Sequence, residues 1–383
     1  MLKALTIVGA RPQFIKASAI SRAIRGKFSN DIHELILHTG QHYDENMSKV
    51  FFEELDIPAP EYNLGIGSAS HGVQTAGMIR GVEELLLAEK PDFLIIYGDT
   101  NSTLAGSIAA SKLHIPVVHI EAGLRSFNKI MPEEINRIVC DHISTLLFTP
   151  TVGGIDNLRR EGFNTNSKSP YTIDNPGIFL CGDVMYDNTL YFGSIAEKRS
   201  RIIESNKLEK GNFILVTVHR EQNTDDLTRL NSIFSALNAI SDDYNETLVI
   251  PIHPRTAKIL ESGLSPALFK AINENPRIRI IPAVSYLDMV QLEKHAKLIM
   301  TDSGGVQKEA YFFKGKCIVL RAETEWTELV DHGMAILADA NAVAIVDAYK
   351  YLTSTTFDNY PPIYGTGSAS EFICSTIVKA FKK

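Results

Sequence analysis

The chain of 383 residues is too long for one ordinary hydrophobic core and predicts two domains. Its formal net charge of -7 gives no electrostatic reason to expect nucleic acid or an anionic membrane as a partner. The cysteines Cys140, Cys181, Cys317 and Cys374 are widely spaced without CxxC pairing, a pattern that favours a cytoplasmic protein over a zinc-binding or disulfide-bonded one. The N-terminus begins as a strand pattern, and no apolar run reaches about 18 residues, so we expect no targeting or membrane segment.

Short apolar runs rich in β-branched residues, each followed by a turn and a helical pattern, recur through the first half of the chain. They span residues 4–8, 34–38, 93–97, 117–121, 146–148 and 178–181. The pattern restarts in the second half, at residues 212–218, 247–252, 278–283, 297–301 and 317–320. Strands that alternate with helices predict parallel, doubly wound α/β sheets. We expect two Rossmann-like domains facing a ligand cleft, at residues 1–185 and 186–364, with a last helical segment at 365–383 that could pack on either domain.

The segments directly after these apolar runs are unusually polar. In open α/β sheets ligands bind beyond the carboxyl ends of the strands, so these segments are the candidate site. They read GARPQFIK, HTGQHYDENM, YGDTNSTLAG, IEAGLRSFNKIMPEEINR, VHREQN, IHPRT, TDSGGVQKEA and RAETEW. Loops that only connect elements would not need so many carboxylates, histidines and arginines.

The segment TDSGGVQKEA predicts a phosphate site. Gly304 and Gly305, after Ser303 and at the first turn of a helix, allow close backbone approach and leave N–H groups at the positive end of the helix dipole. Glu309, about one turn further on, is placed to accept hydrogen bonds from ribose hydroxyls. The alternative is that Asp302 or Ser303 only caps the helix.

The segment GARPQFIK places Arg11 and Lys16 around the first turn from strand to helix. Pro12 at an early helical position fixes the backbone without losing a needed donor. A guanidinium and an ammonium here would offer an anion what glycine N–H groups offer elsewhere, so we expect this turn to face a diphosphate. The alternative is a helix with solvated basic residues.

Three further residues follow buried strands. Asp99 follows the run at 93–97 and either faces the site or caps the next helix. Glu121 ends an apolar strand, where burial would raise its pKa and suit it to proton transfer. His219 ends the first strand of the second domain, and the alternative for it is a satisfied core histidine.

Glu133 and Glu134 follow Pro132 in a predicted first helical turn, where carboxylates favour the helix dipole. Arg137 lies at i+4 from Glu133 and at i+3 from Glu134, so either carboxylate could form an ion pair with it. These residues are candidates for the site, and a structural ion pair is the alternative.

Together these ordered motifs resemble the non-hydrolysing UDP-N-acetylglucosamine 2-epimerases over essentially the whole chain. The resemblance implies a GT-B-like fold, UDP bound mainly by the C-terminal domain, sugar chemistry against the N-terminal domain, a cytoplasmic homodimer, and synthesis of precursors of cell-surface polysaccharides. It also implies a route: UDP is eliminated across C1 and C2 to leave a 2-acetamidoglucal, C2 is protonated on the opposite face, and UDP is added back. No cofactor and no metal is expected.

The resemblance also implies roles for single residues. Asp99, Glu121 and Glu133 match the acid and base carboxylates, and His219 matches a catalytic or phosphate-facing histidine. Residues expected to bind UDP or the sugar are Arg11, Lys16, Arg137, His253, Arg255, Ser303, Gly304, Gly305 and Glu309. A possible regulatory site is formed by Gln41, His42 and Arg80.

Two departures from most relatives concern the substrate. Trp326 replaces the arginine of a T-E-R-P-E run, and Gln13 stands where many relatives have an acid. Both changes are more similar to the branch that acts on UDP-2,3-diacetamido-2,3-dideoxyglucuronate, and a neutral Gln13 would suit a more anionic sugar. The same reaction on that uronate is therefore the first alternative.

Other functions remain open from the residues. A GT-B glycosyltransferase would share the fold and the UDP site, but it needs one base and an acceptor groove, whereas this chain has several candidate acids. A catalytically silent nucleotide-sugar sensor would tolerate loss of Asp99, Glu121 or His219, which are all present. A hydrolysing relative that releases the free sugar is a further alternative.

Overall fold

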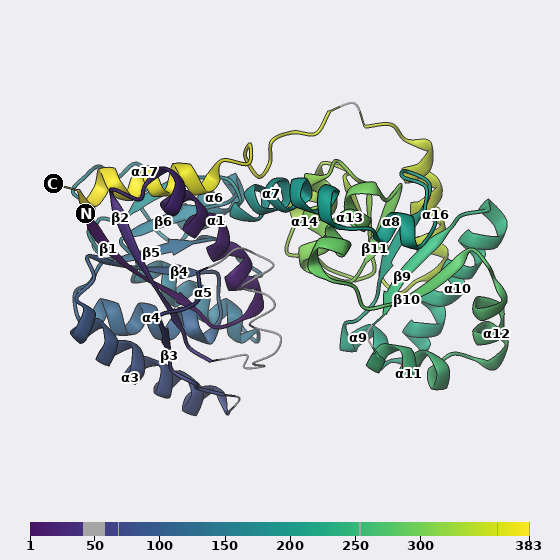
Figure 1. Ribbon diagram of the computed structural model, residues 1–383, viewed down its shortest axis with the longest axis horizontal. Coiled ribbons are helices and arrows are strands. Elements are labelled where there is room, and N and C mark those ends of the chain that lie inside the picture. Colours follow the sequence, from purple (N-terminus) through teal and green to yellow (C-terminus); the bar gives the residue numbers. More distant parts are fainter. Residues whose placement is uncertain (41–57, 68, 253, 358, 383) are drawn as a thin grey trace. The chain divides into compact units, whose positions relative to one another are not determined.

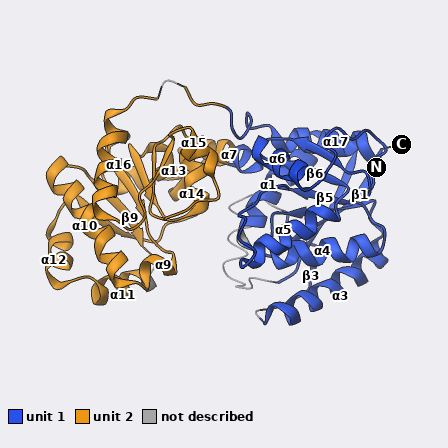
Figure 2. Cartoon of the chain, turned by 180° about the vertical axis from the view of Figure 1, so that it is seen from behind, with its two compact units in different colours: residues 1–188, 362–383 blue, residues 189–361 orange. Residues whose placement is uncertain are grey.

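The computed structural model describes residues 1–40, 58–67, 69–252, 254–357 and 359–382. The chain divides into two compact units (Figure 2). Unit 1 comprises residues 1–188 and 362–383, and unit 2 comprises residues 189–361. Among the described residues, no helix is both long enough and apolar enough to cross a lipid bilayer.

Unit 1 is built on a parallel sheet of seven strands in the order β3-β2-β1-β4-β5-β6-β7. The strands are β1 (Leu2–Val8), β2 (Ile32–His38), β3 (Tyr62–Asn63), β4 (Phe93–Tyr97), β5 (Val117–Ile120), β6 (Leu146–Thr149) and β7 (Gly177–Leu180). All five residues of β4 are buried, because helices cover both faces of the sheet and leave no solvent-facing side. Hence the central strands read as continuous apolar runs rather than as alternating ones.

Helices α1 and α17 lie on one face of this sheet, and α3 and α4 lie on the other (Figure 1). The helices of unit 1 are α1 (Arg11–Lys27), α3 (His71–Glu89), α4 (Asn101–Lys112), α5 (Pro132–His142), α6 (Val152–Arg160) and α17 (Ala369–Phe381), and α7 (Val184–Arg199) continues into unit 2. The last helix, α17, packs on unit 1: the rings of Phe93 and Phe381 stack with centroids 5.3 Å apart. Asp187 on α7 accepts hydrogen bonds from the first amides of α17.

Unit 2 is built on a parallel sheet of six strands in the order β10-β9-β8-β11-β12-β13. The strands are β8 (Ile214–Thr217), β9 (Leu248–Ile252), β10 (Ile278–Pro282), β11 (Leu298–Thr301), β12 (Cys317–Val319) and β13 (Ala335–Leu337). The helices are α8 (Ile202–Ser205), α9 (Glu221–Thr224), α10 (Leu227–Tyr244), α11 (Pro254–Gly263), α12 (Pro266–Glu274), α13 (Tyr286–His295), α14 (Gly304–Phe312), α15 (Thr327–Asp331) and α16 (Ala342–Ser354). Its core joins apolar residues of the strands to those of α10 and α16, among them Phe234 and Leu352.

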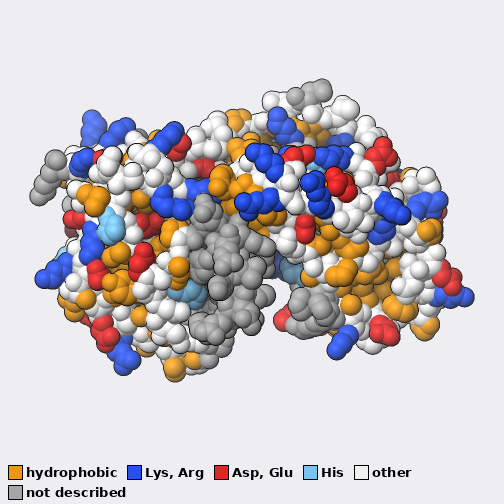
Figure 3. Space-filling model, in the orientation of Figure 1, with side chains coloured by type: hydrophobic (Ala, Val, Ile, Leu, Met, Phe, Trp, Pro, Cys, Tyr) orange, Lys and Arg blue, Asp and Glu red, His pale blue; other side chains and the backbone are white. Residues whose placement is uncertain are grey.

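The predicted fold class is confirmed, since both sheets are parallel and doubly wound. The strands β3 and β13 were not predicted from the sequence, because two or three residues are too few to show a periodic pattern. Acidic and basic side chains are interspersed over the face of the molecule drawn in Figure 3.

Candidate functional site

Each sheet reverses its strand order once, and the segments GARPQFIK, YGDTNSTLAG, VHREQN and TDSGGVQKEA follow the strands at these two reversals. In unit 1 the order reverses between β1 and β4, and in unit 2 it reverses between β8 and β11. Ligands of open α/β sheets bind at such switch points, beyond the carboxyl ends of the strands. At the reversal in unit 1, the turn after β1 packs very closely against the start of α4: a Cβ on Gly9 would lie 2.1 Å from Oγ of Ser102. Only glycine fits there, so the residue after β1 serves close packing of the two turns.

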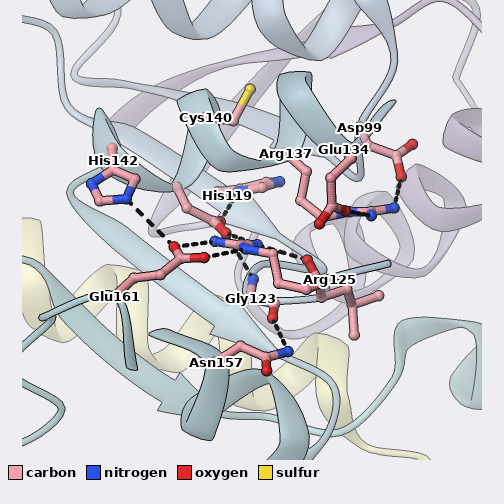
Figure 4. Close-up of polar contacts among 12 residues, drawn as sticks. Asp99, His119, Gly123, Arg125, Glu134, Arg137, Cys140, His142, Asn157 and Glu161 are labelled. Carbon is pink, nitrogen blue, oxygen red and sulfur yellow. Dashed lines mark hydrogen bonds and ion pairs between the residues drawn. The ribbon is translucent and has the colours of Figure 1, made fainter. Parts of the chain in front are cut away.

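Asp99 lies at the switch point of unit 1, directly after β4, and is held by α5 (Figure 4). Nη2 of Arg137 donates to its carboxylate, and Nδ2 of Asn136 donates to its backbone carbonyl over 2.9 Å. Nη1 of Arg137 donates in turn to Glu134 over 2.7 Å. Arg137 therefore joins two carboxylates, and its side chain is only 10% exposed.

Burial raises the pKa of Asp99, and the charge of Arg137 opposes that shift. Lys16 also lowers this pKa, whereas Glu121 raises it, so the charges of all three residues are felt at Asp99. A carboxyl group whose pKa is moved toward neutrality by its surroundings is suited to proton transfer. The capping alternative does not apply, because the side chain that caps α4 belongs to Thr100.

Glu121 follows β5, the neighbour of β4, and forms an ion pair with Lys16. Its Oε2 lies 2.5 Å from Nζ of Lys16, and both side chains are largely buried. The backbone of Glu121 has a φ of +70°, in the left-handed region that a residue with a side chain seldom adopts. Such a conformation persists only where the surroundings determine it, and it is found preferentially at functional sites.

The structure brings Glu134, not Glu133, into the cluster around Arg137. Glu133 is exposed, whereas Glu134 is buried and accepts hydrogen bonds from the amides of Ser126 and Phe127 at 2.9 Å and 3.0 Å. These bonds outweigh the effect of burial and lower the pKa of Glu134. Both spacings from Arg137 were compatible with an ion pair, and packing of α5 against the sheet selects the one at i+3.

Gln13 is buried within unit 1, which removes the basis of our interpretation of this position. Its side chain is buried at 1% exposure; Oε1 accepts from the amides of Gly9 and Ala10, and Nε2 donates to Tyr97 and Thr103. An amide can do both, since it has an acceptor and a donor end. Gln13 thus ties the first turn to β4 and says nothing about the charge of the sugar.

In unit 2 Asp302 joins the two turns at the switch point. Its buried carboxylate accepts from the amides of His219 and Arg220, at 3.1 Å and 3.0 Å, and from Nδ2 of Asn223 at 3.1 Å. Nδ1 of His219 lies 3.3 Å from Oδ1 of Asp302, and 56% of the His219 side chain is exposed. His219 is therefore not a core histidine. Its imidazole is anchored through the nitrogen nearest the backbone, beside the start of α14.

Gly304 and Gly305 begin α14 after the N-cap residue Ser303, whose side chain forms no cap hydrogen bond. Nε1 of Trp326 donates to the carbonyl oxygen of Gly304 over 2.9 Å, which holds the turn from the other side. Nζ of Lys308 lies 3.9 Å from the centroid of the indole ring, a cation–π contact. Trp326 thus fixes the first turn of the helix at the carbonyl of Gly304, and the amide of Ser303 donates to Oγ1 of Thr301 over 2.9 Å.

Glu309 lies on α14 beside a second buried carboxyl group, Glu293 of α13. Burial raises the pKa of Glu293 well above its ordinary value, and the neighbouring Glu309 raises it further. Two adjacent carboxyl groups cannot both be ionised at low cost, which is why Glu309 adds to the rise. Nearby, Arg321 forms a bidentate ion pair with Glu325, with both bonds at 2.9 Å, and lowers the pKa of Glu325 against the effect of burial.

Several predicted site residues are not tested by these contacts. His253, Gln41 and His42 lie outside the described residues. Arg11 opens α1 and Arg255 lies in α11, but their side chains are also outside the description. Arg80, on α3, is exposed and lies 3.9 Å from Glu84 of the same helix.

Residues that the sequence analysis did not single out hold the site in place. His119, hidden in the apolar run at 117–121, bonds to Asp141 at 2.8 Å, and Asp141 also bonds to Arg125 at 2.7 Å. Asp141 follows Arg137 by four positions, so helical spacing from Arg137 could have found it. Asp302 was considered only as a cap, and Trp326 only as a departure from relatives.

Two parallel, doubly wound α/β units with polar switch points define a GT-B-like protein of the nucleotide-sugar enzymes. The chain belongs to the UDP-N-acetylglucosamine 2-epimerase family, whose sequence model matches residues 26–378. It is a UDP-sugar 2-epimerase, an isomerase, and the resemblance seen in its motifs is confirmed.

Individual relatives cover nearly the whole chain. A UDP-N-acetylglucosamine 2-epimerase homolog of Methanococcus maripaludis is 48% identical over 370 residues, which is 96% of this chain and 97% of that protein. The UDP-2,3-diacetamido-2,3-dideoxy-D-glucuronate 2-epimerase of Pseudomonas aeruginosa is 44% identical and covers 99% of this chain and 100% of its own. The crystal structure of the Methanocaldococcus jannaschii UDP-GlcNAc 2-epimerase, in complex with UDP-GlcNAc and UDP, matches 99% of this chain and 100% of that chain, with a TM-score of 0.82 and 42% identity.

Proposed function

We propose that this chain interconverts UDP-GlcNAc and UDP-ManNAc by non-hydrolysing epimerisation at C2. The observation that carries the proposal is the placement of Asp99 and Glu121 after the adjacent strands β4 and β5, each in an ion pair with a buried cation. Epimerisation needs one group that removes a proton and another that returns it on the other face of the ring. Two separately supported carboxyl groups meet that need.

The step in the forward direction is an elimination. One carboxylate takes the proton from C2, the C–H electron pair forms the C1–C2 double bond, and the C1–O bond breaks with its pair leaving on UDP. The return step adds a proton to the other face of C2, and UDP attacks C1. Arg137 and Lys16 keep positive charge beside the two carboxyl groups while protons move.

We assign binding of the diphosphate and the nucleoside to unit 2. The start of α14 at Gly304 and Gly305, which has no side-chain cap, offers N–H groups and the positive end of the helix dipole to phosphate oxygens. His219 lies beside Asp302 with 56% of its side chain exposed, and we propose that it contacts the same diphosphate. An ionised Glu309 would accept hydrogen bonds from the ribose hydroxyls.

The second candidate is the same reaction on UDP-2,3-diacetamido-2,3-dideoxyglucuronate. It is supported by the 44% identity to the Pseudomonas aeruginosa enzyme, close to the 42% identity to the Methanocaldococcus jannaschii UDP-GlcNAc enzyme. The buried position of Gln13 removes one argument for it. Both candidates share the chemistry at C2 and differ in the groups at C3 and C5.

Proton NMR in deuterated buffer tests the proposal and separates the candidates. The protein is incubated without any acceptor, once with UDP-GlcNAc and once with the diacetamido glucuronate. Deuterium at C2 of UDP-GlcNAc, together with its manno epimer, is the expected result, and exchange of the uronate alone would replace it by the second candidate. Binding of UDP without exchange in either sugar would overturn both and favour a transferase or a sensor.

A further inference from the structure

A charged network, most of whose members are labelled in Figure 4, bonds to Gly98 and Gly123 in the turns that carry Asp99 and Glu121. Its buried members are His119 on β5, Asp141 on α5 and the Arg125 side chain in the loop between them, and the exposed Glu161 after α6 forms its outer end. The side chains of His119 and Asp141 are completely buried, and that of Arg125 is 1% exposed. None of these groups takes part in the chemistry proposed above.

The carboxylate of Asp141 is the centre of this network. Oδ1 accepts from Nδ1 of His119 at 2.8 Å, and Oδ2 accepts from Nη1 of Arg125 at 2.7 Å and from the amide of Gly123 at 3.1 Å. Hydrogen bonds and charge from His119, followed by those from Arg125, lower the pKa of Asp141 although burial opposes them. An ionised carboxylate with three donors is an unusually rigid anchor inside a protein.

One arm of the network reaches the turn of Asp99. Nε2 of His119 lies 2.8 Å from the carbonyl oxygen of Gly98, and a carbonyl oxygen only accepts. The other ring nitrogen, Nδ1, contacts Asp141 over 2.8 Å. The residue before Asp99 is therefore fixed to α5 through the imidazole.

The other arm reaches the turn of Glu121. The amide of Gly123 donates to Asp141, and its carbonyl oxygen accepts from Nδ2 of Asn157 at 3.0 Å. Gly123 has a φ of +78°, and a Cβ on it would lie 2.6 Å from the carbonyl oxygen of Gly154, so the backbone there admits glycine alone. These contacts of Gly123, two residues beyond Glu121, help to determine the left-handed backbone of Glu121.

We infer that Asp141 is a positioning residue for the epimerisation, which acts through His119 and Gly123 to hold the turns of Asp99 and Glu121 in one fixed relation. The inference rests on the roles proposed for Asp99 and Glu121. Proton removal and proton return require both carboxyl groups to be correctly placed against one carbon atom, and a displacement of about 1 Å can lower a rate by about 100-fold. Because the Asp141 carboxylate is bonded to one turn through His119 and to the other through Gly123, it keeps Asp99 and Glu121 in a fixed relation.

The experiment compares Asp141→Asn with Glu161→Gln. Asparagine has the shape of Asp141 but places an NH₂ donor against donors, whereas Glu161→Gln weakens only the outer end of the same network, where Glu161 bonds to Arg125 at 2.7 Å. Steady-state epimerisation is measured below the unfolding temperature of both variants, together with UDP binding by calorimetry. We expect kcat of Asp141→Asn to fall at least 10-fold with the Kd for UDP unchanged, and kcat of Glu161→Gln to stay within twofold.

His119→Gln provides the second variant if Asp141→Asn does not fold. Its amide can donate to Gly98 or to Asp141 but not span both, so we expect kcat to fall again without a change in UDP binding. The inference is overturned if these variants keep kcat within twofold of the wild type, or if Glu161→Gln loses as much. Asp99→Asn and Glu121→Gln are measured in parallel: if these retain full activity, the proposed roles of the two carboxyl groups fail instead.

Discussion

Nζ of Lys16 lies 2.5 Å from Oε2 of Glu121, which joins the first helix of unit 1 to the turn after β5. The sequence predicts that Lys16 meets a diphosphate. In the structure its ammonium group lies against the Glu121 carboxylate, and the side chains of Lys16 and Glu121 are 12% and 11% exposed. A largely buried ion pair of this kind costs little only while both partners are present.

Replacing Lys16 by methionine should therefore affect both stability and catalysis. We expect Lys16→Met to lower the free energy of unfolding by about 3 kcal/mol, because Glu121 loses the cation that compensates its burial. The value of kcat should fall by at least ~100-fold, since a displaced or neutralised Glu121 no longer transfers a proton well. Urea unfolding and steady-state kinetics measure the two effects.

Lys27→Met is the matched control for this prediction. Lys27 forms a pair with Glu371 at 2.6 Å, but 65% and 46% of the two side chains are exposed. Its loss should change stability by less than about 1 kcal/mol and leave kcat alone. Equal effects of the two variants would contradict the role of the Lys16–Glu121 pair.

Trp326→Phe should weaken nucleotide binding. Phenylalanine keeps a ring beside Lys308 but removes the Nε1 donor that holds Gly304 at the start of α14. A hydrogen bond of this kind contributes about 1 kcal/mol, so we expect KM for the UDP-sugar to rise about fivefold with little change in kcat. Tyr349→Phe, which removes a bond to Glu246 elsewhere in unit 2, should leave KM unchanged. A fall in kcat alone would argue against this account.

Arg137→Met should move the acid side of the pH–activity profile. Arg137 is the strongest influence that lowers the pKa of Asp99, so its removal raises that pKa further. If the ionised carboxylate of Asp99 is needed, activity is lost as pH falls through this pKa, so the loss should begin at a higher pH than in the wild type. Arg159→Met, at an exposed ion pair with Asp156, is the control. An unmoved acid limb would show that Asp99 is not the group that titrates.

Glu293→Gln should flatten the dependence of stability on pH. The folded-state pKa of Glu293 is raised well above the roughly 4.3 of an unfolded glutamate, so between these two values the folded state binds more protons. Stability of the wild type therefore falls with rising pH in that window, by up to ~1.4 kcal/mol per pH unit for one proton. Glutamine, which has no proton to lose, removes this contribution.

Urea unfolding between pH 5 and 8 measures this effect, with Glu274→Gln as the control. Glu274 is 67% exposed beside Lys270, so its variant should follow the wild-type profile. A Glu293→Gln profile parallel to that of the wild type would mean that Glu293 is ionised in the folded protein, beside Glu309.

The sequence predicted most of the parallel strands, because buried strands in doubly wound sheets are unbroken apolar runs such as Phe93–Tyr97. It also pointed to Asp99, Glu121 and the start of α14, since these follow directly from where strands end. It did not identify His119, which lies inside an apolar strand and whose bonds are made to residues that are adjacent only in space. The short strand β13 was missed for lack of a pattern.

The sequence by itself determined the family, the doubly wound sheets and the places at which polar side chains gather, because these depend on local order along the chain and on periodicity. The tertiary structure decided which of two neighbouring carboxylates reaches Arg137, since only the packing of α5 distinguishes the buried Glu134 from the exposed Glu133. It also decided that Gln13 bonds within unit 1 and that Lys16 faces Glu121. Those choices depend on distances across the sheet, which no spacing in the sequence encodes.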